Sequence, residues 1–313
     1  MGLSLLTSNI SPLTCGTRDG LMADDLRERI SLITDEYSAD PATAFELGRQ
    51  WGVEHYEIRG AYRFRAPVGP AWVADRVAAA VADYGVTITA ISPGLFKPTM
   101  RTDGSTEPIS ADAPAEVRRH LDELLPAFFA FAEAVGTRNI TVFALPRGDA
   151  PPDAAPPAIV IDSLAQAAER AAAGGLQLLL ENGGGTWACS AEETAAILAA
   201  VGSPALKLTW DPANVAYAAL DGPDPVADGY PLIRPHVANV HVKDVAVVED
   251  QPRWCMIGDG LIDWPTQLAQ LRADGYPGRL TLEPHLQYEP GRDLDLVAMQ
   301  AEYLRRTQVL AGG

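Results

Sequence analysis

The sequence is poor in cysteine and has no long hydrophobic run. Its three cysteines, Cys15, Cys189 and Cys255, lie far apart, without the close pairs of a zinc knuckle or a redox motif. We expect free thiols in a reducing cytoplasm. No segment reaches the roughly 20 consecutive apolar residues of a membrane-spanning helix, and the apolar segment from Met1 to Ile10 lacks the basic residues of a secretory signal. We therefore expect a cytoplasmic protein without a membrane partner.

Basic side chains are also scarce. The 313 residues include 24 Lys and Arg against 41 Asp and Glu, which gives a formal net charge of −17. Such a chain repels phosphate backbones and anionic membrane surfaces at long range. We expect a small-molecule substrate and no nucleic-acid partner. Hydrophobic types make up 47% and charged types 21% of the chain, a balance typical of a globular protein with a sizeable core.

Several catalytic motifs are missing. The chain has no G-x-S-x-G sequence, and no cysteine has a histidine in a recognisable arrangement, so a nucleophilic serine or cysteine is unsupported. The run Gly183 to Gly185 lacks the Lys-Ser/Thr and the second glycine of a phosphate-binding P-loop. We interpret this run as a loop that needs positive φ or close approach of the backbone to a ligand.

Short apolar runs alternate with longer segments whose apolar residues recur every three or four positions. This alternation is typical of a parallel sheet with crossover helices. Eight strands are predicted: Leu3 to Ile10, His55 to Arg59, Thr87 to Ile91, Asn139 to Phe143, Gln177 to Glu181, Ala205 to Asp211, Asn239 to Asp244 and Arg279 to Glu283.

The predicted helices carry capping signals. Ser190 and Glu193 form a capping box that opens a helix toward Ala200. Asp263, with Pro265 in the first turn, opens another helix that ends near Gly275.

Two further segments are helical in period. The segment from Ala113 to Val135 contains Pro126, which predicts a kink or two helices. The final helix is expected from Asp293 to Leu310.

The number of repeats predicts the fold. Eight strand–helix units in a chain of this length are typical of a single (β/α)8 TIM barrel, with a doubly wound open sheet as the alternative. The stretch from Asp149 to Ala158 is a long loop rather than a linker between domains. We therefore expect one α/β domain over residues 1–313.

Polar side chains finish several otherwise apolar strands. In a (β/α)8 barrel the functional residues lie at the carboxyl ends of the strands and in the loops that follow. The residues at these ends are Glu57 and Arg59 on the second strand, Glu181 on the fifth, Asp211 on the sixth, His241, Lys243 and Asp244 on the seventh, and Glu283 and His285 on the eighth.

A cation is the simplest reason for this grouping. Three carboxylates and an imidazole from four adjacent strands would repel one another strongly unless a divalent metal lay between them. Oxygen-rich ligation with one imidazole favours Mn²⁺, with Mg²⁺ or Co²⁺ next, and zinc is also compatible. A single glutamate at a strand end is usually solvated; four polar ends on consecutive strands are a stronger signal.

The remaining histidines are weaker candidates. His55 opens the second strand at its amino end and is expected to be structural. His120 lies among charged residues on a helix and is expected to be solvated, and His236 precedes the seventh strand as a surface or capping residue.

Five motifs together resemble a known superfamily. Glu181-Asn182, Trp210-Asp-Pro-Ala-Asn214, His241-Val-Lys-Asp244, Gly258-Asp-Gly260 and Leu282-Glu-Pro284 are similar, in order and spacing, to those of the sugar phosphate isomerase/epimerase superfamily of xylose isomerase-like TIM barrels. The similarity covers most of the chain and is strongest from Leu176 onward. It implies one divalent ion held by Glu181, Asp211, His241 and Glu283.

The resemblance implies a reaction class with one departure. Ketose epimerases of this superfamily usually place a substrate-binding histidine three residues after the aspartate, where this chain has Asn214. An asparagine still donates hydrogen bonds to a hydroxyl, but it does not titrate near neutral pH.

The leading hypothesis is a metal-dependent sugar, sugar phosphate or polyol-ketone isomerase or epimerase that works through an enediolate. Glu181 and Glu283 would exchange the proton on opposite sides of the reacting carbon. Glu57, Arg59, Asn214, Lys243 and His285 are expected to bind substrate or to support the site.

Three alternatives remain open at this stage. A metal-dependent dehydratase or lyase of the inosose dehydratase type would use the same site, with Lys243 or His285 as the general acid. A nuclease of the endonuclease IV type would need more metal-binding histidines, and the net charge opposes it. A barrel that binds a ligand without catalysing a reaction is the third alternative. The sequence leaves the substrate and the oligomeric state open, a homo-oligomer included.

Overall fold

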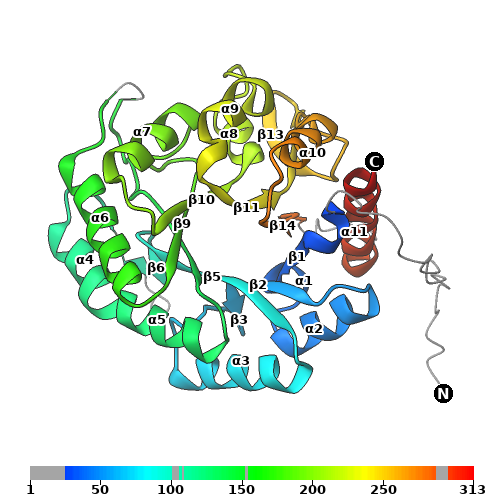
Figure 1. Ribbon diagram of the computed structural model, residues 1–313, viewed down its shortest axis with the longest axis horizontal. Coiled ribbons are helices and arrows are strands. Elements are labelled where there is room, and N and C mark those ends of the chain that lie inside the picture. The colour runs from blue at the N-terminus through cyan, green and yellow to red at the C-terminus, as the bar shows by residue number, and fades with distance from the viewer. Residues whose placement is uncertain (1–24, 101–105, 108, 152–153, 287–294) are drawn as a thin grey trace.

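The computed structural model describes residues 25–100, 106–107, 109–151, 154–286 and 295–313. Eight parallel strands close into a barrel, and helices surround it (Figure 1). The order around the barrel is β1 (Ile30–Ile33), β14 (Arg279–Leu282), β11 (Val237–Val242), β10 (Leu206–Trp210), β9 (Gln177–Glu181), β8 (Asn139–Val142), β5 (Thr87–Leu95) and β2 (His55–Ile58). Since β1 pairs with both β2 and β14, the predicted (β/α)8 barrel is confirmed and the open sheet is excluded.

The outer layer consists of helices that follow the strands. Its principal members are α1 (Thr34–Tyr37), α2 (Pro41–Gln50), α3 (Ala71–Tyr84), α4 (Pro114–Arg119), α5 (Leu125–Ala134), α6 (Ala158–Ala173), α7 (Ala191–Val201), α8 (Pro212–Ala218), α9 (Tyr230–Ile233), α10 (Trp264–Ala273) and α11 (Leu296–Gly312). None of the helices in the described ranges combines the length and hydrophobicity that crossing a membrane requires.

Short elements connect this layer to the barrel. Four of them are single turns of 3-10 or π-helix: η1 (Leu26–Arg29), η2 (His120–Leu124), η3 (Pro225–Gly229) and η4 (Arg234–His236). Three small antiparallel ribbons lie outside the barrel sheet: β3 (Gly60–Ala61) with β4 (Phe64–Arg65), β6 (Thr99–Met100) with β7 (Thr106–Glu107), and β12 (Asp244–Val248) with β13 (Gln251–Cys255). Each ribbon follows a barrel strand, so it stands at the carboxyl end of the barrel.

Helix α6 shows how the sequence builds the outer layer. Its buried residues include Val160, Leu164 and Ala171, whose spacing places them on one face toward the barrel. The two capping predictions are confirmed: Ser190 and Glu193 form a reciprocal capping box at the start of α7, and Asp263 caps α10 with Pro265 in its first turn.

The predicted first strand was wrong. Leu3 to Ile10 lies outside the described residues, and the barrel is closed by Ile30–Ile33 instead. This strand has only four residues, all of them buried, so it shows no alternation of apolar and polar side chains. The longer apolar run near the start of the chain gave the stronger sequence signal.

The segment from Ala113 to Val135 forms two α-helices separated by the π-helical turn η2, and Pro126 lies in the first turn of α5. Within η2, His120 is fully buried, so the expectation that it is solvated was wrong. Its Nδ1 accepts a 3.0 Å hydrogen bond from the backbone N–H of Phe96, and its ring stacks on the Phe96 ring. Phe96 has a φ of 62°, a left-handed conformation that costs energy for a bulky residue.

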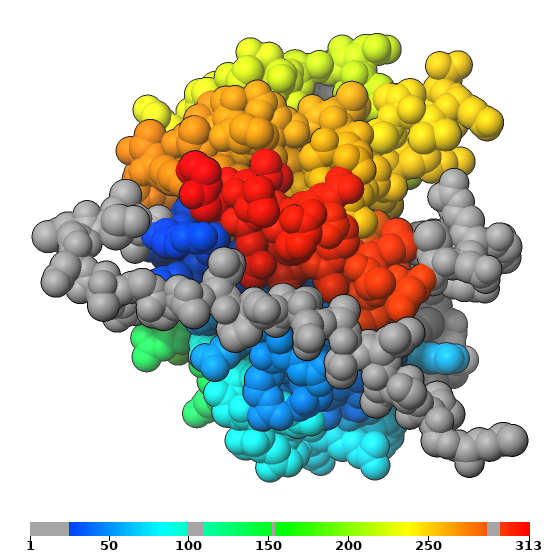
Figure 2. Space-filling view, turned by 90° about the vertical axis from the view of Figure 1, so that its right-hand side faces the viewer, coloured from blue at the N-terminus to red at the C-terminus, as the bar shows by residue number. Residues whose placement is uncertain are grey.

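The two ends of the described chain meet at one side of the barrel. Figure 2 shows α11, in red, beside the blue residues that begin the described chain. The Arg272 side chain of α10 donates to the backbone oxygens of Leu310 and Ala311 in α11, at 3.4 and 2.7 Å. Helix α11 begins at Leu296, close to the predicted start at Asp293. Residues 287–294 lie outside the described part.

The thiol prediction is tested in part. Cys189 and Cys255 are free cysteines, and Cys15 lies outside the described residues.

Candidate metal centre

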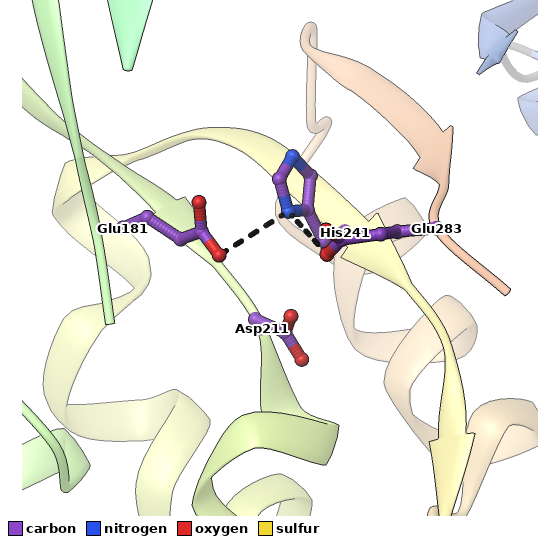
Figure 3. Close-up of side chains that lie close together, drawn as sticks. All are labelled: Glu181, Asp211, His241 and Glu283. Carbon is purple, nitrogen blue, oxygen red and sulfur yellow. Dashed lines mark ion pairs between the residues drawn. The ribbon is translucent and has the colours of Figure 1, made fainter. Parts of the chain in front are cut away.

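Four adjacent strands bring one acidic cluster together at the carboxyl end of the barrel. Glu181 ends β9, Asp211 follows β10, His241 lies in β11 and Glu283 follows β14 (Figure 3). One potential ligand atom from each of these residues lies within 4.8 Å of the others, and all four side chains are buried. The four residues that the resemblance implied as ligands are therefore neighbours in space, in an arrangement that fits a single ion.

Local structure orients Asp211. It caps the amino end of α8, where its Oδ1 accepts a 2.9 Å hydrogen bond from the backbone N–H of Asn214. The Asn182 side chain bridges to the Asp211 backbone through two 2.8 Å hydrogen bonds. Pro212 suits the first helical position because its missing N–H has no partner there in any helix. These contacts leave Oδ2 of Asp211 pointing toward the cluster.

Buried polar residues inside the barrel orient His241. Glu57 is fully buried, and its carboxylate lies 3.2 Å from Nε2 of His241 and accepts a 3.1 Å hydrogen bond from the Asn239 side chain. Asn239 in turn accepts a 2.9 Å hydrogen bond from Thr281. A proton on Nε2 satisfies Glu57 and leaves the lone pair of Nδ1 directed at the cluster, as in carboxylate–histidine–metal arrangements.

Cations surround Glu283. Its Oε1 accepts a 2.6 Å hydrogen bond from Arg59, and its Oε2 lies 2.8 Å from Nζ of Lys243. The same Nζ lies 2.8 Å from Oδ2 of Asp211. The other nitrogens of Arg59 contact Asp35 at 3.0 Å and Glu36 at 2.5 Å. Arg59 therefore fixes Glu283 within an ion network instead of facing an open pocket.

The cluster shifts the protonation of its members. Burial raises the pKa of Glu181, but the charge of His241 outweighs it and lowers this pKa to about 2. Burial also opposes ionisation of Glu283, yet Lys243 and His241 hold its pKa well below the usual range. The pKa of Asp211 is raised because burial outweighs the charge of Lys243.

His241 responds in the opposite sense. Burial alone would lower the pKa of His241, but the carboxylates of Glu57, Glu283 and Glu181 raise it well above its ordinary value. In the protein without an ion, a proton on the imidazole thus balances part of the negative charge. Metal ligation needs the neutral imidazole, so a divalent cation would displace that proton.

The donor set fits a divalent ion. Nδ1 of His241 is buried and has no hydrogen-bond partner in the described structure, although it lies 3.1 Å from Glu283 and 3.7 Å from Glu181. A buried nitrogen without a hydrogen bond, close to two carboxylates, needs a proton or a coordinated cation between them. Three carboxylates with one imidazole are ligands of the hard or borderline divalent metals, which does not identify the metal.

The remaining predicted residues surround the cluster. Asn214 donates a 2.9 Å hydrogen bond to the backbone of Asn182 and lies 3.4 Å from Glu181. His285 is half-buried, with Nδ1 2.9 Å from Glu36 and Nε2 3.5 Å from Glu283. Lys243 lies inside the cluster. Whether these residues contact substrate stays a prediction.

Sequence reasoning missed an aromatic wall beside the site. The ribbon β12–β13 places Trp254 with its ring 4.8 Å from Nζ of Lys243, and the Tyr217 ring stacks on Trp254 at 4.3 Å. Tyr217 lies on α8, a few residues after Asp211. Tyr217 follows the carboxyl end of a barrel strand by a few residues, and this position was an available signal. Trp254 had none, because the ribbon that carries it is a local excursion from the barrel pattern.

Solved structures share this fold. An L-ribulose 3-epimerase is 20% identical, with a TM-score of 0.65 over 90% of this chain and 94% of that chain. A D-allulose 3-epimerase from Methylomonas sp. is 17% identical, with a TM-score of 0.66 over 90% and 97%. The probable 3-DHS dehydratase AsbF from Bacillus anthracis is 17% identical, with a TM-score of 0.65 over 89% and 98%. No curated protein matches the sequence.

The sequence itself also matches a family model. The match to the xylose isomerase-like TIM barrel model covers residues 45–307, which include seven of the eight barrel strands and the whole acidic cluster. It confirms the resemblance that the five sequence motifs indicated. The chain belongs to the family of xylose isomerase-like TIM barrels.

Proposed function

We propose that this protein is a divalent-metal-dependent isomerase or epimerase of a small sugar or polyol ketone, acting by proton transfer at the carbon next to the carbonyl. The observation that carries the proposal is the position of the two glutamates. Glu181 ends β9 and Glu283 follows β14. The strands β10 and β11 lie between these two strands in the barrel. The two carboxylates therefore approach the site from opposite sides, as removal and return of a proton on two faces of a carbon require.

Glu181, Asp211, His241 and Glu283 would hold the ion, with Mn²⁺ favoured and Mg²⁺, Co²⁺ or Zn²⁺ as the other candidates. When bound, such an ion supplies positive charge that stabilises negative charge developing on substrate oxygens. The low pKa values of Glu181 and Glu283 keep both carboxylates ionised, the form in which a general base acts. Arg59 and Lys243 hold Glu283 in place through contacts of 2.6 and 2.8 Å.

Two structural neighbours support this class, since one is named an L-ribulose 3-epimerase and another a D-allulose 3-epimerase. The metal and the substrate are part of the proposal. The five histidines of the chain count against a nuclease with several zinc ions. Only His241 and His285 lie in the candidate site, while His120 is bonded to Phe96.

A metal-dependent dehydratase or lyase is the second candidate. It is favoured by His285, whose half-buried ring lies 3.5 Å from Glu283 and is placed to donate a proton to a leaving hydroxyl. Burial lowers the pKa of Lys243, but Asp211 and Glu283 outweigh it and raise this pKa, so Lys243 holds its proton and is the poorer acid. The named neighbour AsbF, a probable 3-DHS dehydratase, supports this candidate.

Proton exchange tests the proposal directly. The protein is loaded with Mn²⁺, and a panel of ketoses, inososes and keto-glycosides is incubated with it in deuterated water. We expect NMR to show loss of the proton next to the carbonyl for at least one compound. Mass spectrometry separates the two candidates, because isomerisation conserves mass and dehydration removes one water.

The matched variants are Glu283→Gln, in the site, and Glu123→Gln, on the exposed surface. Exchange should fall by about 10³-fold or more in Glu283→Gln and stay unchanged in Glu123→Gln, since loss of a general base typically costs 10²–10⁴-fold. Exchange at the parent rate in Glu283→Gln would refute the role of this glutamate.

A further inference from the structure

Two cations at the mouth of the site have no acidic partner among the described residues. Lys97 follows β5, and Arg65 belongs to β4. Both side chains are half-buried, and no carboxylate forms an ion pair with either one in the described structure. Lys97 contacts the face of the Phe143 ring, 3.5 Å from its centroid, while Arg65 donates a 2.9 Å hydrogen bond to the backbone oxygen of Ser92. These contacts position both charges without neutralising them.

Lys97 and Arg65 lie in segments that follow the barrel strands β5 and β2, at the same end of the barrel as the acidic cluster. Burial lowers the pKa of Lys97 to about 8, although the charges of Glu181 and Glu283 act in the opposite direction. Burial and the charge of Arg59 lower the pKa of Arg65, which also feels Glu181 and Glu283. Asp35 is the other acid near Arg65, and Arg59 already occupies it at 3.0 Å. Both cations therefore lie at the carboxyl end of the barrel without an ion-pair partner among the described residues.

The ion pairs of the centre do not include these cations. Three carboxylates carry three negative charges, and a divalent ion with the Lys243 ammonium would offset all of them. Arg59 contacts Asp35, Glu36 and Glu283, and Glu57 contacts His241. Each of these carboxylates thus already has a basic partner, whereas Lys97 and Arg65 form no ion pair among the described residues. Buried charges without partners are costly, so a ligand that pairs with them gains affinity.

The lysine content of the chain adds a second observation. The sequence contains three lysines, Lys97, Lys207 and Lys243, against 21 arginines. Two of these three lie at this site. An ammonium group presents a compact charge that contacts carboxylate or phosphate oxygens from several directions.

We infer that the substrate carries an anionic oxygen group, a carboxylate or a phosphate, held by Lys97 and Arg65. This inference rests on the proposed function, since it assigns the class of compound that this same site accepts. The cations lie after β5 and on the ribbon that follows β2, whereas the acidic cluster comes from β9, β10, β11 and β14. The reacting carbons would lie over the acidic cluster, and the anionic group would extend toward the opposite side of the barrel mouth.

Binding measurements test the inference without turnover. The Mn²⁺-loaded protein is titrated by calorimetry with three six-carbon probes: D-fructose, which is neutral, D-fructose 6-phosphate and 2-keto-D-gluconate. We expect at least one anionic probe to bind about tenfold or more tightly than D-fructose, as a charge-assisted hydrogen bond implies. A preference for the phosphate or for the carboxylate identifies which anion the site accepts. Equal binding of all three probes would overturn the inference.

Variants assign the effect to its residue. Lys97→Met keeps the contact with the Phe143 ring and removes the charge, so affinity for the preferred anion should fall about tenfold while D-fructose is unaffected. Lys97→Arg should restore most of the preference. Lys207→Met is the matched control, because Lys207 lies near the opposite end of the barrel in β10. An anion preference that survives both Lys97→Met and Arg65→Met would overturn the assignment.

A spectroscopic readout covers variants that fold poorly. Reductive ¹³C-methylation keeps the charge of lysine, and with three lysines in the chain the labelled spectrum is simple. The Lys97 resonance should shift on addition of the anionic probe and not of D-fructose. An unmoved Lys97 resonance at saturating anion would refute the contact.

The two proposals fail differently. Anion preference without any proton exchange would leave this inference standing and overturn the proposed isomerase. Exchange of neutral ketoses without any anion preference would do the reverse.

Discussion

The two ends of the barrel treat charge in opposite ways. At the amino end, a pocket of about 720 Å³ is lined by Arg138, Lys207, Arg234 and Arg279, and the described structure places no carboxylate in its wall. Its charged groups stay in contact with water, and Arg234 pairs with Asp274 at 3.3 Å. At the carboxyl end, Asp211 is 0%, His241 1% and Lys243 2% exposed.

This difference lies in the hydration of the charges. The amino-end pocket holds charges that water solvates, whereas the carboxyl end holds charges that only one another, or a ligand, can stabilise. Desolvating the charges at the carboxyl end lowers the stability of the folded protein. Active sites are where proteins use charges that are desolvated in this way. The position agrees with (β/α)8 barrels in general, in which the carboxyl end carries the chemistry.

The largest expected contrast concerns the metal. His241→Ala and Asp211→Asn should reduce bound metal from about one ion per chain to a small fraction, because the first removes one of the four proposed ligands and the second removes the charge of another. Arg138→Ser, at the amino end, should leave the metal content unchanged. Elemental analysis after loading and removal of excess ion measures both. Full metal occupancy in His241→Ala would show that the acidic cluster is not the binding site.

A smaller contrast in metal affinity is expected between two glutamates, one in β2 and one just before it. Glu57, inside the barrel, contacts His241, while Glu54 precedes the same strand at its exposed amino end. Glu57→Gln should weaken metal binding about 10- to 100-fold, the usual effect of losing an outer partner of a metal-bound histidine. Glu54→Gln should have no effect. Competition with a chelator gives both affinities, and equal affinities would contradict the orienting role of Glu57.

Acid sensitivity should differ between the fully buried His120 and the half-buried His236. Burial lowers the pKa of His120 from 6.5 to about 4. Neutral His120 therefore stabilises the fold fully above about pH 6.5, and this contribution is lost as the pH falls toward 4, by up to about 3 kcal/mol. Urea unfolding at several pH values should show a shallower acid loss in His120→Asn than in the parent.

The control for that measurement is His236→Gln, because His236 lies half-buried beside the amino-end pocket. Its pKa is lowered by burial and by Lys207, but no neighbouring backbone depends on it through a hydrogen bond in the described residues. The acid slope of this variant should resemble that of the parent more closely. Identical slopes in all three proteins would contradict the role of His120.

The smallest effects are expected in the amino-end pocket itself. Lys207→Met and Arg138→Ser remove charges that are solvated, so each should change the free energy of unfolding by no more than about 0.5 kcal/mol. Proton exchange should be unaffected. Chemical denaturation and the exchange assay measure these values, and loss of exchange in either variant would mean that the amino-end pocket takes part in function.

Much of the barrel follows from sequence because seven strands are apolar runs with polar ends. Gln177–Glu181 was predicted with its observed bounds. Asp211 and Glu283, predicted as the last residues of their strands, come directly after strands that end one residue earlier. The ordered motifs made the cluster visible before any coordinates. The proposed metal ligands could be grouped because parallel strands bring their carboxyl ends to one edge. The single domain over residues 1–313 and the roles of individual side chains stay predictions.

The two wrong predictions, the first barrel strand and the exposure of His120, have a common physical origin. Ile30–Ile33 and His120 are both decided by tertiary packing, which local pattern does not report. A four-residue strand buried on all sides has no period, and a histidine among charged helix residues is indistinguishable in sequence from a solvated one. The lack of an acidic partner for Lys97 and Arg65 was equally hidden, because only the folded chain shows that no acid in the described residues pairs with them.

The hydrogen bond that the backbone N–H of Phe96 donates to His120 has a consequence for substrate selectivity. It fixes the backbone directly before Lys97 in a left-handed conformation, while the Phe143 ring confines the lysine itself. Ordering a free lysine side chain costs up to about 2 kcal/mol of conformational entropy, and much of that loss here precedes binding. The chain thus presents a preorganised ammonium whose position depends on a helical turn more than 20 residues away. Substitutions in that turn should therefore weaken the proposed anion contact without touching the substrate.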